Sequence, residues 1–169
     1  MSLKLSKRLA KIVEMCENVD TIVDVGTDHG KVPITLVNLG IAKNVIAIDN
    51  KNGPLDICKR NAEIYIQNKD VSFRTLLSNG INDVPKNTET GIIITGIGFD
   101  NIKEIIKNIN EYNFKYLILS PHTKITELIK FLSNINIQIK SQESVFEDDK
   151  YYYIIKATKG DQIVNKGID

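Results

Sequence analysis

Short runs of β-branched and aliphatic residues alternate along the chain with longer stretches in which apolar residues recur every three or four positions. The runs predict buried strands over residues 21–25, 44–48, 71–76, 91–95 and 116–119. The stretches predict amphipathic helices over about 3–17, 31–39 and 52–68, and two more after the candidate caps Asp100 and Thr123. Strands that alternate with helices in this way indicate an α/β fold built on a parallel sheet.

The carboxyl-terminal part of the chain follows a different pattern. Residues 135–146 alternate between apolar and polar side chains, which is typical of a strand with one buried face. A charged turn over 147–150 leads into a last strand over 151–157, and strands joined by so short a turn must pair antiparallel. We therefore expect a seven-stranded, mostly parallel sheet with an antiparallel carboxyl-terminal hairpin and helices on both faces.

The strand at 21–25 leads into the loop with the strongest signal for a ligand site. Open α/β sheets bind ligands at the carboxyl ends of their strands, and Gly26 lets the backbone approach a bound group closely. The carboxylates of Asp24 and Asp28 would repel a diphosphate and attract a cationic ligand. The loop also lacks the G-x-G-x-x-G pattern of nicotinamide cofactor sites. The loop therefore favours S-adenosylmethionine over a dinucleotide. The expected antiparallel hairpin points the same way, because the sheets of dinucleotide-binding folds are all parallel.

Further polar residues follow the next strands. Asp49 ends the second strand, 23 residues after Gly26, and an acid near this offset accepts hydrogen bonds from ribose hydroxyls. The turn after the third strand lies where a methyltransferase contacts adenine. The expected cofactor-binding residues are Asp24, Gly26, Thr27, His29, Asp49, Asn50, Asn79, Gly80 and Gly96. Simpler interpretations remain open: Asp28 as a helix cap, Asp49 as a turn acid, and 79–80 as a plain surface turn.

Length and composition fit one globular domain. The chain has 169 residues, of which 42% are hydrophobic and 25% charged, and we expect a domain over 1–160 followed by a tail over 161–169. It contains neither a long apolar run nor a signal-peptide pattern, so we expect a cytoplasmic protein without a membrane partner. Two cysteines outside a C-x-x-C motif are expected to be reduced. Two histidines without H-x-x-x-H spacing predict no metal site.

Charge says little about partners. The net charge of +1 is low for a domain that binds nucleic acid strongly. One local basic cluster, Lys4, Lys7, Arg8 and Lys11, falls on the predicted first helix. It is either a solvated helix face or a contact with a phosphate backbone. We expect a monomer or a weak dimer.

Several motifs resemble the bacterial tRNA (adenine-22-N1)-methyltransferases, a family of class I methyltransferases with a Rossmann-like fold. The similarity covers nearly all of residues 3–160. Its most specific parts are residues 3–9, Leu-Lys-Leu-Ser-Lys-Arg-Leu, and residues 24–29, Asp-Val-Gly-Thr-Asp-His. Pro33, residues 49–54, Lys59-Arg60, Gly96-Ile97-Gly98 and Glu147-Asp148 followed by tyrosines also fit. The resemblance implies methyl transfer from S-adenosylmethionine to N1 of an adenine in the tRNA D-loop.

The resemblance also implies roles for individual residues. Asp28 would contact the exocyclic amine of the adenine, and Ser120, Pro121 and His122 would position the base. Phe99 or His122 would stack on a flipped base, and Lys7 and Arg8 would contact tRNA. This chain has Asn79 where the family has an acid, Phe99 where it has glycine, and Ser-Pro-His at 120–122 where it has Gln-Pro-Asn. The family's carboxyl-terminal helical hairpin is not in this sequence.

Adenine N1 carries its lone pair in the ring plane, so it can attack a sulfonium methyl group without a general base. Alignment and exclusion of water would then do most of the work. Three other functions remain open at this stage. They are methyl transfer to another substrate, a non-catalytic domain that binds cofactor or RNA, and, least favoured, a nicotinamide-dependent oxidoreductase.

Overall fold

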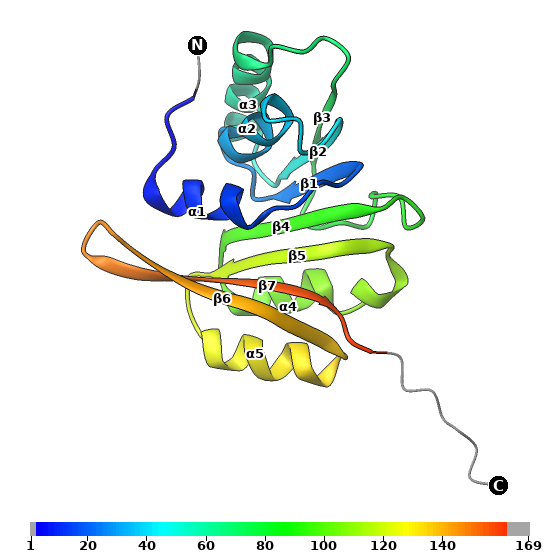
Figure 1. Ribbon diagram of the computed structural model, residues 1–169, viewed down its shortest axis with the longest axis vertical. Helices are drawn as coiled ribbons and strands as arrows, with labels where there is room; N and C mark the ends of the chain where they lie inside the picture. Colours follow the sequence, from blue (N-terminus) through cyan, green and yellow to red (C-terminus); the bar gives the residue numbers. More distant parts are fainter. Residues whose placement is uncertain (1–2, 162–169) are drawn as a thin grey trace, which may run out of the picture.

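A computed structural model describes residues 3–161 and contains one seven-stranded sheet with helices on both faces (Figure 1). The strand order is β3-β2-β1-β4-β5-β7-β6. The strands β1 to β5 pair in parallel, and β7 pairs antiparallel with both β5 and β6. The bounds are β1 Thr21–Val25, β2 Asn44–Asp49, β3 Ser72–Leu77, β4 Thr90–Ile97, β5 Phe114–Pro121, β6 Ile137–Glu147 and β7 Lys150–Lys159. The predicted fold class is confirmed.

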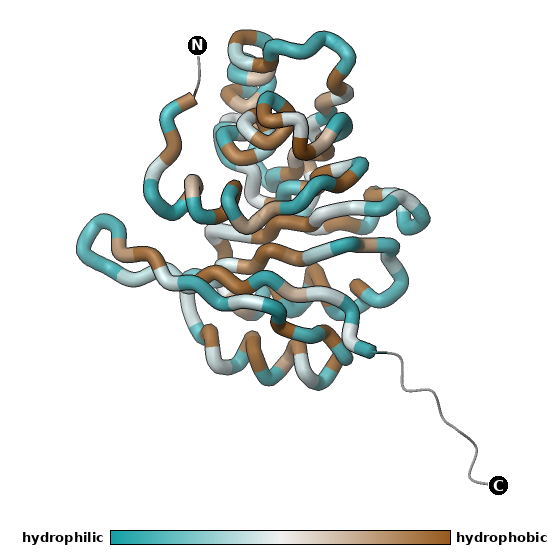
Figure 2. Tube along the Cα trace, in the orientation of Figure 1, coloured by the Kyte–Doolittle hydropathy of each residue, from teal (hydrophilic) through white to brown (hydrophobic). Residues whose placement is uncertain are grey.

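The helices form two layers around the sheet. Helices α1 (Lys7–Met15), α2 (Lys31–Asn38) and α3 (Asn52–Tyr65) cover one face, where Ile12, Leu36 and Cys58 are buried. Helices α4 (Phe99–Ile106) and α5 (Ile125–Asn134) and the short helix η1 (Ile109–Glu111) cover the other. Figure 2 shows apolar residues concentrated along the central strands, as expected of parallel strands buried on both faces. None of the helices in residues 3–161 is long and apolar enough to cross a membrane.

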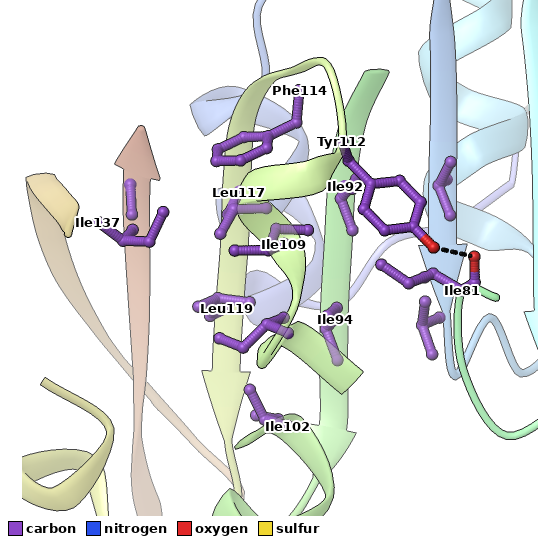
Figure 3. Packing of buried hydrophobic residues seen from close by; sticks show 14 of the residues in the cluster. Ile81, Ile92, Ile94, Ile102, Ile109, Tyr112, Phe114, Leu117, Leu119 and Ile137 are labelled. Carbon is purple, nitrogen blue, oxygen red and sulfur yellow. Dashed lines mark hydrogen bonds between the residues drawn. The ribbon is translucent and has the colours of Figure 1, made fainter. Parts of the chain in front are cut away.

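A buried tyrosine helps to hold the long connection between β3 and β4 against the core. The hydroxyl of Tyr112 donates a hydrogen bond of 2.9 Å to the carbonyl oxygen of Ile81 (Figure 3). Around this bond, Ile92, Ile94 and Leu117 fill the space between the sheet and α4. The bond satisfies a polar group that packing would otherwise leave buried without a partner.

The loop after β1 passes very close to the backbone of the neighbouring strand β4. Gly26 has φ +76°, and a Cβ built there would lie 2.9 Å from the carbonyl oxygen of Thr95. The amides of Gly26 and Thr27 both donate to the carbonyl oxygen of Ile48, at 2.9 Å each. Glycine is therefore required at this position by the approach of the neighbouring strand as well as by its backbone conformation.

Four predictions of helix ends or caps were wrong. Helix α1 begins at Lys7 rather than near residue 3, because the hydroxyl of Ser6 accepts a hydrogen bond from the amide of Leu9 and caps the helix there. Asp100 lies inside the first turn of α4, whose cap position is Gly98. Thr123 does not cap α5, because Lys124 takes the cap position with φ +60° and makes no side-chain cap bond. Helix α3 ends at Tyr65 instead of near 68.

The β6–β7 hairpin extends past the carboxyl edge of the parallel strands. Its pairing with β5 ends at Leu119 and Ile155, whereas β6 and β7 stay paired to Glu147 and Lys150. The turn beyond them uses two aspartates with positive φ, 51° and 62°, the conformation that a two-residue hairpin turn requires. In Figure 1 this turn projects beside the start of α1. The expected tail lies, from residue 162 on, outside the described residues.

Candidate active site

A cavity of about 730 Å³ opens at the carboxyl edge of the sheet. Its walls come from the loops after β1, β2, β3 and β4, from α1 and α4, and from the residue that follows β5. This volume falls in the range of small-molecule and cofactor sites. The cavity therefore lies where an α/β sheet is expected to bind its ligand.

Most of the predicted site residues meet in this cavity, although each comes from a different part of the chain. Those that line it are Arg8, Asp24, Gly26, Thr27, Asp28, His29, Asp49, Asn50, Asn79, Gly96 and His122. Those that do not line it are Lys7, Gly80, Phe99, Ser120 and Pro121.

Two predicted site residues, Ser120 and Pro121, are the last residues of β5 and are held away from the cavity. The hydroxyl of Ser120 is buried and donates a hydrogen bond of 2.9 Å to the carbonyl oxygen of Tyr153. Pro121 is buried at the end of β5, where it pairs with Ile97. Both residues therefore fix the strand end, and His122, which follows the strand and is exposed, is the residue of 120–122 that reaches the cavity.

Phe99 and Gly80 also have structural partners. The ring of Phe99 packs edge to face against Phe131, with centroids 6.4 Å apart, on the side of the core. This position does not offer the ring to a base in the cavity. The amide of Gly80 donates to the hydroxyl of Ser78 at 3.2 Å and closes the turn. Asn79 and Ser78 are the residues of this turn that line the cavity.

Asp24 is the buried acid of the cavity. Desolvation, with a smaller effect from the nearby charges of Asp49 and Asp28, raises the pKa of its carboxyl from the ordinary 3.8 to about 7. The Thr27 hydroxyl favours the charged form of Asp24, although its oxygen is buried without a hydrogen bond of normal geometry. No salt bridge joins Asp24 to a cation within residues 3–161. A positively charged ligand would satisfy this carboxylate.

Asp49 connects two loops of the cavity through its carboxylate. One oxygen accepts a hydrogen bond of 3.1 Å from the amide of Asp28, and the other accepts one of 3.1 Å from the amide of Lys51. These bonds fix the direction of the carboxylate, and each oxygen retains further acceptor capacity. Asp49 therefore organises the loops and also remains available to a ligand.

The structure does not use Asp28 as a helix cap. The cap position of α2 is Gly30, which makes no side-chain cap bond. Asp28 has φ +54°, and its exposed carboxylate lies 3.7 Å from the Nε2 atom of His29. A non-glycine residue in this strained conformation at a cavity is a candidate for function.

Arg8 supplies positive charge at the cavity wall. Its guanidinium lies 4.9 Å from the ring centre of Tyr152, and its Nε atom is buried without a hydrogen-bond partner. Its backbone amide donates to the carboxylate of Glu147 at 3.2 Å, which fixes the start of α1 against the hairpin. Arg8 is therefore held at the cavity by packing, with donors free for an anion.

The sequence did not reveal the contribution of α4. Asn101, Glu104 and Ile105 line the cavity together with Leu9, Lys31, Lys51 and Ser78. Positions 101, 104 and 105 share one face of a helix, but periodicity alone does not show that this face meets a ligand loop. Within residues 3–161, no group of three or more His, Cys, Asp or Glu side chains is placed to hold a metal ion.

The fold and this cavity together define a Rossmann-like methyltransferase. The chain belongs to the methyltransferase domain family, whose model matches residues 5–155. Within that class it is similar to the TrmK proteins. It is 28% identical to the tRNA (adenine(22)-N(1))-methyltransferase of Bacillus subtilis over 162 residues, which cover 95% of this chain and 67% of that protein.

Two solved structures support the same assignment. TrmK of M. capricolum, in complex with S-adenosyl-homocysteine, has a TM-score of 0.81 and 31% identity, with 95% of this chain and 73% of that one covered. Sp1610 of Streptococcus pneumoniae, in complex with S-adenosyl-L-methionine, has a TM-score of 0.81 and 27% identity, with 93% and 74% covered.

Proposed function

We propose that this chain transfers the methyl group of S-adenosylmethionine to N1 of adenine 22 in the D-loop of tRNA. The observation that carries the proposal is the buried carboxylate of Asp24, which lies in a cavity of suitable size and forms no salt bridge within residues 3–161. The cavity also carries Asp28, Asp49 and Glu104, and the cations Arg8, Lys31 and Lys51. Such a mixture of charges suits a ligand that bears both signs, as the methionine part of S-adenosylmethionine does.

The residues present fit the cofactor piece by piece. Asp24, with Gly26 beside it, would face the methionine moiety. Asp49, held by two backbone amides, would accept hydrogen bonds from the ribose hydroxyls. Asn79 at the turn after β3 would meet the adenine, and an amide can both donate to and accept from that base. When bound, S-adenosylmethionine supplies an electrophilic methyl group.

The target base would enter beside Asp28 and His122, which are both exposed at the cavity. Asp28 would accept a hydrogen bond from the exocyclic amine of adenine and thereby orient N1, whose lone pair needs no general base. His122 would stack on the base or donate to it, a role for which Phe99 is badly placed. The main contributions to the rate would be alignment and exclusion of water.

Methyl transfer to two matched tRNA transcripts tests the proposal. One transcript carries adenine at position 22, and the other differs only by guanosine there. Mass spectrometry of the digested tRNA should find 1-methyladenosine in the first and none in the second. Equal methylation of the two transcripts, or none of either, would refute the proposal.

A further inference from the structure

The outer part of the β6–β7 hairpin carries an exposed cluster of aromatic rings. Phe146, Tyr151 and Tyr153 are 51%, 64% and 40% exposed, and every exposed aromatic side chain among the large hydrophobic residues of the described chain lies here. Phe146 is directly opposite Tyr151, and their ring centres are 5.0 Å apart. Tyr151 and Tyr153 are two positions apart on one strand, so the three rings share one side of the hairpin, which we call the aromatic face.

The aromatic face lies beside the candidate active site. The carbonyl oxygen of Tyr153 accepts the hydrogen bond from Ser120, two residues before His122 at the cavity. On the opposite side of the hairpin, the ring of Tyr152 supports the guanidinium of Arg8, which also lines the cavity. One side of the hairpin therefore packs against a residue of the cavity wall, Arg8. The aromatic face lies on the other side, on the strand whose backbone holds Ser120, so it is close to His122 without lining the cavity itself.

The charges around the hairpin indicate which part of a nucleic acid would contact it. The turn carries Asp148 and Asp149, which would repel a phosphate backbone. The exposed cations Lys4 and Lys7 lie instead at the start of α1 and have no salt-bridge partner in residues 3–161. Bases would then contact the hairpin while phosphates contact α1.

We propose that the aromatic face stacks unpaired bases of the RNA substrate next to the base that is methylated. Aromatic side chains stack on any base, so the face would hold the strand without reading its sequence. The inference rests on the proposed function and adds a second RNA contact to it. Self-association explains the face less well, because three half-exposed rings offer roughly 300 Å², against about 800 Å² per partner in a stable dimer.

The test compares three variants of the full chain. F146A/Y151A removes two rings, Y151F keeps a ring at its position, and I64A removes an equally exposed side chain, 59% exposed, from α3. For each protein, filter binding gives the Kd for unmodified tRNA, kinetics give the KM for tRNA, and calorimetry gives the Kd for S-adenosylmethionine.

F146A/Y151A should raise the Kd and KM for tRNA about tenfold or more, while Y151F and I64A stay within about twofold of the wild type. The Kd for S-adenosylmethionine and the melting temperature should not change. If F146A/Y151A has the same Kd for tRNA as I64A, the inference is overturned. If the variants change tRNA binding as expected but the wild type transfers no methyl group, the proposed function alone is refuted. A wild type that binds no tRNA would refute both.

Discussion

The buried carboxylate of Asp24 makes cofactor binding depend on pH. Its pKa of about 7 in the ligand-free protein means that the group is mostly protonated at pH 6. A cationic ligand favours the charged form, so binding at pH 6 should release about 0.9 proton from this group. The Kd for S-adenosylmethionine should be lowest above pH 7 and rise by up to about tenfold for each pH unit below it.

The same pKa predicts how the stability of the ligand-free protein changes with pH. The folded pKa lies above the unfolded one, so the folded state binds the proton more tightly between pH 4 and 7. The stabilisation is complete below about pH 4 and is lost as the pH rises through 7. This group alone should lower the free energy of unfolding by about 4 kcal/mol across that window.

Calorimetry at pH 6 in two buffers of different ionisation enthalpy measures the released proton. Asp24→Asn is the control, because it removes the titrating group but keeps the shape of the side chain. It should bind the cofactor weakly, and its affinity and stability should vary less with pH than those of the wild type. The reasoning about Asp24 is refuted if the wild type binds without net proton release and with a Kd that is constant from pH 5.5 to 8.

Three further predictions concern single positions. In denaturant titrations, Gly26→Ala should lower the free energy of unfolding by about 1 to 3 kcal/mol more than Gly40→Ala. Both glycines have positive φ, but only at Gly26 would an added Cβ lie 2.9 Å from the carbonyl oxygen of Thr95. Equal losses of stability would contradict this close approach. Asp28→Ala should abolish methylation and leave the melting temperature within a few degrees, since its side chain caps no helix; full activity would remove Asp28 from the reaction. Lys7→Ala, tested by tRNA binding between 50 and 200 mM salt, should reduce the salt slope by about one, and an unchanged slope would assign Lys7 to a solvated face.

The sheet was predictable because its strands are strongly marked. The strands β1, β2 and β4 are rich in β-branched residues and β5 in aliphatic ones, and the structure buries β1 and most of β2, β4 and β5. The hairpin followed from alternation and a short charged turn. Helix starts were less predictable, because several residues near each start can cap. Ser6 competes with residues further upstream, and Lys124 displaces Thr123 through a positive φ that its residue type does not suggest.

Residues of the site were predictable where the strand ends themselves supply them. Asp24, Asp49 and Gly96 lie at the carboxyl ends of parallel strands and Asn79 in the turn after β3, and the parallel sheet brings all four to one edge. The sequence pattern did not predict which side chains turn away from this edge, as Ser120 does toward β7. Nor did it show that α4 and Leu9 complete the cavity, because these contacts depend on how the helices pack against the loops.

Calorimetric titration with S-adenosylmethionine, with NAD as the comparison, tests the central claim most directly. The cavity should bind the cationic methyl donor and should reject NAD, because Asp24 and Asp28 favour a cation and repel a diphosphate. Binding of S-adenosylmethionine alone is the predicted result. Binding of NAD, or of neither ligand, would contradict the assignment of this cavity.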